Sequence, residues 1–134
     1  DGFDYIILDA PCSGSGIMRR RPEVPWTKTK QQLETLVTIQ SKLLDACWQI
    51  LKNRGILIYC TCSIFYNEGE GQVAKFLKRR QNVNRKSGPG LIYPTIGKDY
   101  FLKYKLENKL DNTELNYIGN DGFFYAMLEK QESS

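Results

Sequence analysis

Two apolar runs, each ending in a turn of small residues, place the strongest constraint on how this chain can fold. The first run covers residues 3–8 and ends at Asp9-Ala10-Pro11, and the second covers residues 55–60 and ends in a Thr-Cys-Ser turn. Such runs, without alternating polar residues, are typical of strands buried on both faces of a parallel sheet. The sequence therefore predicts two parallel strands that lie next to each other.

The segment between these runs predicts a long amphipathic helix. Its apolar residues recur at spacings of three and four: Leu33, Leu36, Val37, Leu43, Leu44, Cys47, Trp48 and Leu51. This is the spacing of one helical face. We expect the helix to end near Asn53, with Gly55 supplying the left-handed residue that helix ends favour.

The remainder of the chain predicts a second helix and a final strand. Asn67 and Glu70 have the spacing of a capping box, and the residues from 73 to 77 continue on one helical face. Residues 82–90 are expected to form a polar loop, and residues 91–96 a short strand weakened by a proline. Residues 97–120 receive no assignment, and residues 123–128 form the last strand. The order of elements indicates an α/β doubly wound sheet.

Composition limits the classes of protein that fit. The 134 residues suffice for one domain or part of one, with 41% hydrophobic and 25% charged residues. No apolar run approaches the roughly 20 residues that cross a membrane, and residues 1–10 do not resemble a signal peptide. We therefore expect a soluble protein without a membrane partner.

The cysteines indicate free thiols rather than a metal site or disulfides. Cysteines occur at positions 12, 47, 60 and 62, and there is no histidine. The C-x-C spacing of Cys60 and Cys62 does not match common zinc knuckles, and Cys47 falls on the apolar face of the predicted helix. We expect no metal, and free thiols favour a reducing, cytoplasmic location.

The positive charge is gathered in two clusters, although the formal net charge is only +4. One cluster follows the first cysteine turn (Arg19, Arg20, Arg21, Lys28 and Lys30), and the other lies at Lys75, Lys78, Arg79, Arg80, Arg85 and Lys86. Clustered cations favour a polyanionic partner, and a solvated surface is the alternative.

Three residues with chemical potential follow the ends of the two predicted strands. Asp9, Cys12 and Cys62 lie where neighbouring parallel strands of an open α/β sheet converge on one crevice. A thiol in a strand-to-helix turn is a candidate nucleophile, because such a position lowers its pKa and exposes it. The alternative is that Cys12 and Cys62 are small buried side chains that only fill space. We favour that structural role for the other two cysteines, Cys47 and Cys60.

The motifs "DAPCSGSG", "RRRPEVPW", "IQSKLLDACW", "LKNRGILIYCTCSI" and "DGFFYAML" resemble the Sun/Fmu-type RNA (cytosine-5) methyltransferases. Within this family the likeness is greatest to the bacterial enzymes that act on small-subunit ribosomal RNA. The resemblance is good over residues 1–81 and 121–130 and thin between them. The pairing of a D-A-P-C-S-G turn with a T-C-S-I turn is highly specific.

The resemblance implies the second half of a Rossmann-like sheet that binds S-adenosylmethionine, with mostly parallel strands and crossover helices. The glycine-rich turn and acidic residue with which this family binds its cofactor are not found in residues 1–134. We therefore expect the chain to be the carboxyl-terminal part of the catalytic domain, inactive alone, and able to self-associate through its first strand.

The resemblance also assigns roles to residues. Cys62 would attack carbon 6 of a cytosine, Cys12 would assist release of the methylated base, and Asp9 would hold the cytosine edge near the cofactor. Methyltransferases that act on DNA cytosine use a Pro-Cys cysteine as nucleophile, so Cys12 remains an alternative attacker. The run Arg19, Arg20 and Arg21 would contact RNA phosphates.

Two functions of other classes remain open from sequence. A non-catalytic RNA-binding module would use the basic clusters and keep its thiols as structural residues. A thiol oxidoreductase is disfavoured because the chain has no C-x2-C motif.

Overall fold

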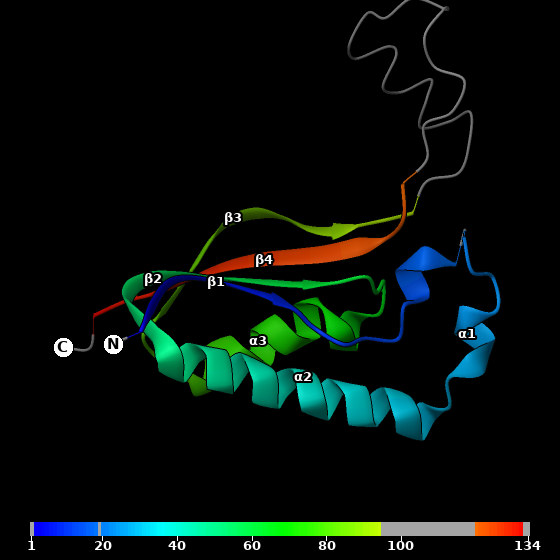
Figure 1. The fold of residues 1–134 in the computed structure, drawn as a ribbon, viewed down its shortest axis with the longest axis horizontal. Helices are drawn as coiled ribbons and strands as arrows, with labels where there is room; N and C mark the ends of the chain where they lie inside the picture. Colours follow the sequence, from blue (N-terminus) through cyan, green and yellow to red (C-terminus); the bar gives the residue numbers. More distant parts are fainter. Residues whose placement is uncertain (1, 19, 95–119, 133–134) are drawn as a thin grey trace, which may run out of the picture.

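The computed structural model describes residues 2–18, 20–94 and 120–132, which form a sheet with helices on one face (Figure 1). The strands are β1 (Phe3–Asp9), β2 (Leu51–Thr61), β3 (Val83–Ile92) and β4 (Phe123–Lys130), in the order β1-β2-β4-β3. The helices α2 (Lys30–Ile50) and α3 (Glu70–Arg79) pack beneath this sheet, and the short α1 (Val24–Thr27) precedes α2.

The strand directions confirm the predicted α/β class. β1 pairs with β2 in parallel, whereas β4 lies between β2 and β3 and is antiparallel to both. β1, β2 and β3 therefore run in the same direction and β4 alone is reversed, which makes a mixed sheet with crossover helices. The carboxyl ends of β1 and β2 accordingly lie at the same edge of the sheet.

β1 is an edge strand, and the prediction that both of its faces are buried is wrong for the described residues. On the face away from the helices, Phe3 is 58%, Tyr5 76% and Ile7 71% exposed. Leu8, on the other face, is buried. Strand composition alone cannot show that no described element covers one face of the sheet. The exposed apolar edge that we expected is confirmed, whereas self-association through it stays a prediction.

The long helix α2 is confirmed, but its predicted end is wrong. α2 begins at a capping box formed by Thr29 and Gln32, and it stops at Ile50, because Leu51 is already extended and opens β2. The left-handed residue of the connection is Arg54, with φ 63°, rather than Gly55. None of the helices in the described ranges is long and apolar enough to cross a membrane.

The second crossover helix, α3, is also confirmed without the predicted capping box. A 3-10 turn (η2, Tyr66–Glu68) comes first, and α3 begins after Gly69, with no side chain capping it. Glu70 does not bond back to residue 67. It pairs instead with Arg85 of β3. An ion pair between α3 and β3 thus replaces the local contact that the spacing predicted.

The predicted polar loop over residues 82–90 is wrong, because this segment forms most of β3. Its polar residues fit an edge strand, where Lys86 pairs with Glu129 of β4 at 2.7 Å. The register is irregular between Lys86 and Gly90, and Gly90 has a positive φ of 63°. A separate strand was expected over residues 91–96, but residues 91 and 92 are the end of β3, which stops at Ile92. Residues 95–119 lie outside the described residues.

The core lies between the sheet and the two helices. Its fully buried members come from every layer: Leu44, Leu57, Tyr59, Val73, Phe76, Phe124 and Leu128. Trp48 of α2 meets Phe76 of α3 edge to face, with ring centroids 5.2 Å apart. This packing joins both helices to the sheet and so holds the strand ends in place.

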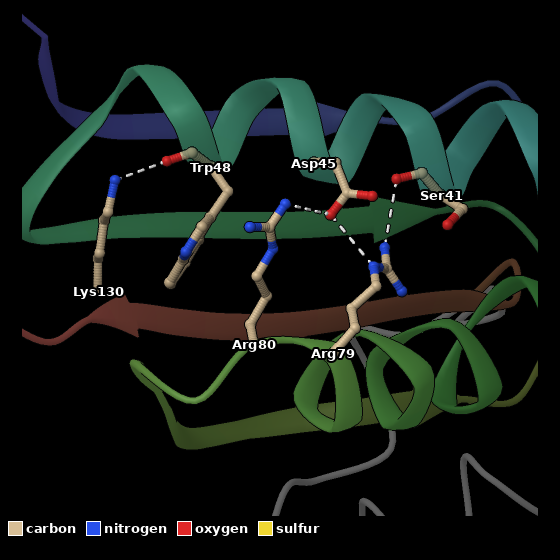
Figure 2. A network of polar contacts seen from close by, with 6 residues as sticks. All are labelled: Ser41, Asp45, Trp48, Arg79, Arg80 and Lys130. Carbon is tan, nitrogen blue, oxygen red and sulfur yellow. Dashed lines mark hydrogen bonds and ion pairs between the residues drawn. The ribbon is translucent and has the colours of Figure 1, made fainter. Parts of the chain in front are cut away.

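A polar cluster around Asp45 ties α2 to its neighbours (Figure 2). Arg79 and Arg80 both donate to Asp45 Oδ1, each at 3.1 Å. Lys130 of β4 donates to the carbonyl oxygens of Trp48 and Leu51, at 2.8 and 2.7 Å. A cation is favourable there because the last carbonyls of a helix lack partners within the helix.

Candidate active site

Cys12 and Cys62 meet at the shared edge of β1 and β2. The parallel register pairs Asp9 with Cys60, so the turns that follow the two strands begin side by side. The sulfur atoms of Cys12 and Cys62 are 3.2 Å apart and both side chains are partly buried. The prediction that the two thiols lie together at one edge of the sheet is thereby confirmed.

Backbone hydrogen bonds hold the two turns against each other. Ala10 N donates to Cys60 O at 3.0 Å, and Gly16 N donates to Cys62 O at 2.9 Å. Gly122, just before β4, donates to Gly16 O at 2.7 Å. A Cβ atom on Gly16 would lie 2.0 Å from Gly122 O, so this close approach requires glycine.

A buried carboxylate lies beneath both turns. Glu68 is 1% exposed, and its Oε1 accepts from Ser13 N at 2.8 Å and from Gln40 Nε2 at 3.1 Å. Its Oε2 accepts from Ser13 Oγ at 2.6 Å and from Ser63 Oγ. Ser63 Oγ also lies 3.0 Å from Ser15 Oγ. We call these five residues the Glu68 cluster.

The contact between the thiols makes them chemically different. The hydrogen bond to Cys62, together with burial, raises the pKa of Cys12 well above its ordinary value. The same hydrogen bond from Cys12 lowers the pKa of Cys62 to about 7, although burial opposes this shift. The opposite directions of these two pKa shifts favour Cys12 as the S–H donor and Cys62 as the thiolate, and so favour Cys62 as the nucleophile near neutral pH.

The other predicted side chains lie at the same edge or are structural. Asp9 is exposed at the end of β1, and its Oδ1 is 4.0 Å from Cys60 Sγ. Cys47 packs against the core, as expected for a filler. All four cysteines are free, and no group of three potential ligands in the described parts of the chain could hold a metal ion.

The described members of the arginine run are exposed and have carboxylate partners. Arg20 Nε lies 2.7 Å from Asp121 Oδ2, and Arg21 Nε lies 2.9 Å from Glu23 Oε1. The arginine side chains are 63% and 65% exposed. Arg19 lies outside the described residues, and a role for this run in RNA binding stays a prediction.

A cavity of about 600 Å³ is lined by residues of α2 and by residues 65–68, Glu68 among them. Its lining includes Phe65, Tyr66 and Lys75. Neither thiol lines it.

Sequence reasoning missed the Glu68 cluster. Glu68 stands in the segment that we interpreted as a helix cap, so its burial was not foreseen. One signal was available, because Gln40 lies three residues after Val37 and three before Leu43, on the apolar face of α2. A polar residue at such a position needs buried hydrogen-bond partners.

A family description, 16S rRNA methyltransferase RsmB/F, matches residues 1–129. The chain belongs to this family. It is 40% identical over 129 residues to the ribosomal RNA small subunit methyltransferase B of Photorhabdus laumondii, covering 96% of this chain and 27% of that protein. It is 38% identical over 128 residues to the protein of the same name from Pasteurella multocida, covering 96% and 26%. The chain thus spans about a quarter of the length of these relatives.

Solved structures of methyltransferases share the fold. The structure of NSun6 from Pyrococcus horikoshii with SFG matches with a TM-score of 0.63 and 26% identity, covering 96% of this chain and 30% of that one. A methyltransferase homolog from the same organism matches with a TM-score of 0.62 and 25% identity, covering 96% and 39%. These likenesses support the partial Rossmann-like fold of an S-adenosylmethionine-dependent methyltransferase.

Proposed function

We propose that the protein containing this chain methylates carbon 5 of a cytosine in small-subunit ribosomal RNA through a covalent bond to Cys62. The observation that carries this proposal is the 3.2 Å contact between Cys12 and Cys62 at the ends of two parallel strands. Membership of the RsmB/F family supports the transfer of a methyl group to ribosomal RNA. Cytosine and the covalent step are our inference from the two thiols.

Cys62 is suited to activate carbon 5 of the cytosine for methylation. Carbon 5 of cytosine is a poor nucleophile, whereas addition of a thiolate to carbon 6 makes carbon 5 electron-rich. The lowered pKa of Cys62, which follows from the hydrogen bond donated by Cys12, keeps a large share of this thiol ionised near neutral pH. Cys62 therefore attacks, and Cys12 remains protonated at that stage.

Cys12 is suited to the release of the product. Its raised pKa depends first on its hydrogen bond to Cys62. Once the Cys62 sulfur is bonded to carbon 6, that charged partner is gone and the pKa of Cys12 falls. Cys12 then gives up its proton to water, and its thiolate accepts the proton from carbon 5. The electrons of that C–H bond form the double bond between carbons 5 and 6, and the bond between carbon 6 and sulfur breaks with its electrons returning to Cys62.

S-adenosylmethionine would supply the methyl group. The exposed carboxylate of Asp9 fits a place beside it, because Asp9 forms no ion pair within the described ranges and lies at the same strand ends as the thiols. Asp9 would accept hydrogen bonds from the amino edge of the cytosine. The related NSun6 structure with SFG, an analogue of S-adenosylmethionine, supports this cofactor.

RNA would approach the edge of the sheet where the cysteine turns lie. Arg20 and Arg21 follow the Cys12 turn, and to hold phosphates they would exchange their present carboxylate partners. A target base must leave its helical stack before a thiol can reach carbon 6. Ribosomal RNA as substrate implies work in the cytoplasm.

Cysteine variants of the complete protein test this function. Cys62→Ala should abolish methylation of small-subunit ribosomal RNA and form no covalent adduct. Cys12→Ala should accumulate a protein–RNA adduct that survives denaturing electrophoresis, because elimination is slowed. Cys47→Ala, which changes a core filler, is the control and should methylate normally. Adduct in Cys62→Ala but not in Cys12→Ala would give Cys12 the role of nucleophile, and normal methylation by both would overturn the covalent cysteine mechanism. A complete parent protein that binds RNA but transfers no methyl group would leave a non-catalytic RNA-binding module.

A further inference from the structure

One carboxylate reaches both of the turns that carry the thiols. Ser13 directly follows Cys12, and Ser63 directly follows Cys62. Both serines donate to Glu68 Oε2, and Ser13 N donates to Oε1. Glu68 therefore forms a bridge between the residues next to the two sulfur atoms.

Backbone bonds alone leave the residues around Cys12 without an anchor. The hydrogen bonds from Ala10 N to Cys60 O and from Gly16 N to Cys62 O hold the two ends of the first turn. Residues 11–13 lie between these points, and Ser13 is joined to the carboxylate at 2.6 and 2.8 Å. The carboxylate of Glu68 thus accepts two hydrogen bonds at the centre of the turn, from the backbone and the side chain of Ser13.

Glu68 is itself held at both ends. Tyr59 Oη donates to the backbone oxygen of Glu68 at 2.6 Å, which fixes the main chain of η2. Gln40 of α2 donates to Glu68 Oε1 and also to Pro11 O, at 3.1 and 2.9 Å. Gln72 of α3 donates to Gln40 Oε1 at 3.2 Å. A fully buried group with this many fixed partners has little freedom to move.

We propose that Glu68 is a positioning residue whose carboxylate holds the Cys12 and Cys62 turns together and so keeps the two thiols in contact. Its importance for catalysis rests on the proposed function, but its effect on thiol geometry does not. Glu68 touches neither sulfur in this arrangement and acts through Ser13 and Ser63. No role for this residue follows from its position in the sequence alone.

Two substitutions separate the effect of the hydrogen bonds of Glu68 from the effect of its negative charge. Glu68→Ala removes the hydrogen bonds and the charge together. Glu68→Gln keeps the shape, because the amide oxygen can still accept from Ser13 N and Gln40, and the amide nitrogen can donate to the serine hydroxyls. Glu70→Gln is the matched control: it makes the same change two residues away, in a side chain that pairs with Arg85 and does not contact the cysteine turns.

The first measurement is the equilibrium between the two thiols and oxidised glutathione. In the complete protein carrying Cys47→Ala and Cys60→Ala, Cys12 and Cys62 are oxidised to one disulfide while one oxidised glutathione is reduced to two thiols. Mass spectrometry of the Cys12–Cys62 peptide pair gives the equilibrium constant. Glu68→Ala should lower this constant by about tenfold or more, because the thiols lose their effective concentration, whereas Glu68→Gln and Glu70→Gln should stay within about threefold.

The second measurement is the pH dependence of Cys62 alkylation by iodoacetamide in the same background. Besides Glu68, the ionisable groups that influence Cys62 are Cys12 and Asp9. Glu68→Ala should raise the pKa of Cys62, because the thiol loses the hydrogen bond from Cys12. Glu68→Gln should leave the pKa of Cys62 unchanged or lower it, because the charge of Glu68 acts to raise that pKa.

The outcomes distinguish this proposal from the proposed function. An unchanged disulfide equilibrium and an unchanged pKa of Cys62 in a folded Glu68→Ala protein overturn the positioning role. If Glu68→Ala does not fold, Ser63→Ala takes its place, and a disulfide constant equal to that of the parent protein overturns the role in the same way. If the parent protein never methylates cytosine, but Glu68→Ala shows the expected loss of thiol contact, the proposed function is refuted and the positioning role stands. If the proposed function and the positioning role both hold, Glu68→Ala should lower kcat by about tenfold or more with little change in KM.

Discussion

The Glu68 cluster and the Asp45 cluster are each built around one carboxylate, but the first carboxylate is buried and the second is partly exposed. Each carboxylate accepts several hydrogen bonds and joins α2 to another part of the molecule. Glu68 is 1% exposed and accepts only from uncharged donors, whereas Asp45 is 32% exposed and accepts from Arg79 and Arg80. Salt and water weaken the pairs of Asp45, but the bonds of Glu68 are sheltered from both.

The difference shows what a reactive pair of thiols requires from its surroundings. An arginine beside Glu68 would also attract the Cys62 thiolate and compete with the hydrogen bond from Cys12. Serine and glutamine donors hold the carboxylate without introducing such a cation. We infer that the uncharged cluster sets geometry near the thiols, whereas the charged cluster contributes only to stability.

The largest expected difference is in folding stability. Glu68→Ala leaves Ser13 N buried without its acceptor and removes one of the two acceptors of Gln40 Nε2, which should cost about 3 kcal/mol of unfolding free energy. Asp45→Ala should cost about 1 kcal/mol or less, since its partners are a third exposed and can turn to water. Urea denaturation of the complete protein measures both. Equal losses would contradict the distinction between the two clusters.

A second prediction sharpens the comparison through the reactivity of Cys62. Because its pKa is lowered to about 7, about half of Cys62 should be thiolate near pH 7, so its alkylation rate should be half-maximal there, whereas burial raises the pKa of Cys47. At pH 7 iodoacetamide should therefore modify Cys62 faster than Cys47 by about tenfold or more. Asp45→Asn should leave this profile unchanged, and a midpoint for Cys62 near the ordinary thiol value of 9 would refute the pairing of the sulfurs.

The smallest effect concerns the pH dependence of the Asp45 cluster. Burial raises the pKa of Asp45, but hydrogen bonds from Arg79 and Arg80 outweigh it and bring the pKa below its ordinary value of 3.8. The stabilisation is therefore present above that pH and is lost as the pH falls through the pKa of the folded state. Asp45→Asn should cost about 0.5 kcal/mol at pH 7, and this cost should shrink as the pH falls below 3.8. Urea midpoints at several pH values check this, and a cost that does not shrink in acid would contradict it.

Local chemistry was enough to predict several features from sequence. The apolar run of β1, the spacing along α2 and the apolar face of α3 indicated these elements correctly. The errors came at places where a distant contact decided the outcome. Glu70 pairs with Arg85 of β3 instead of capping α3, and the polar residues 83–90 form a strand because β4 offers them a partner.

The sequence by itself determined that two strands end in cysteine turns, because apolar runs, prolines and small residues act locally. From this alone it followed that Cys12 and Cys62 would lie at one edge. The tertiary structure alone decided that the sulfurs touch at 3.2 Å and that a carboxylate lies beneath them. Glu68 stands 55 residues from Ser13 and 28 from Gln40, and no short-range pattern encodes contacts across such separations. They exist because sheet and helices exclude water from that carboxylate, which then must accept whichever donors the folded chain brings to it.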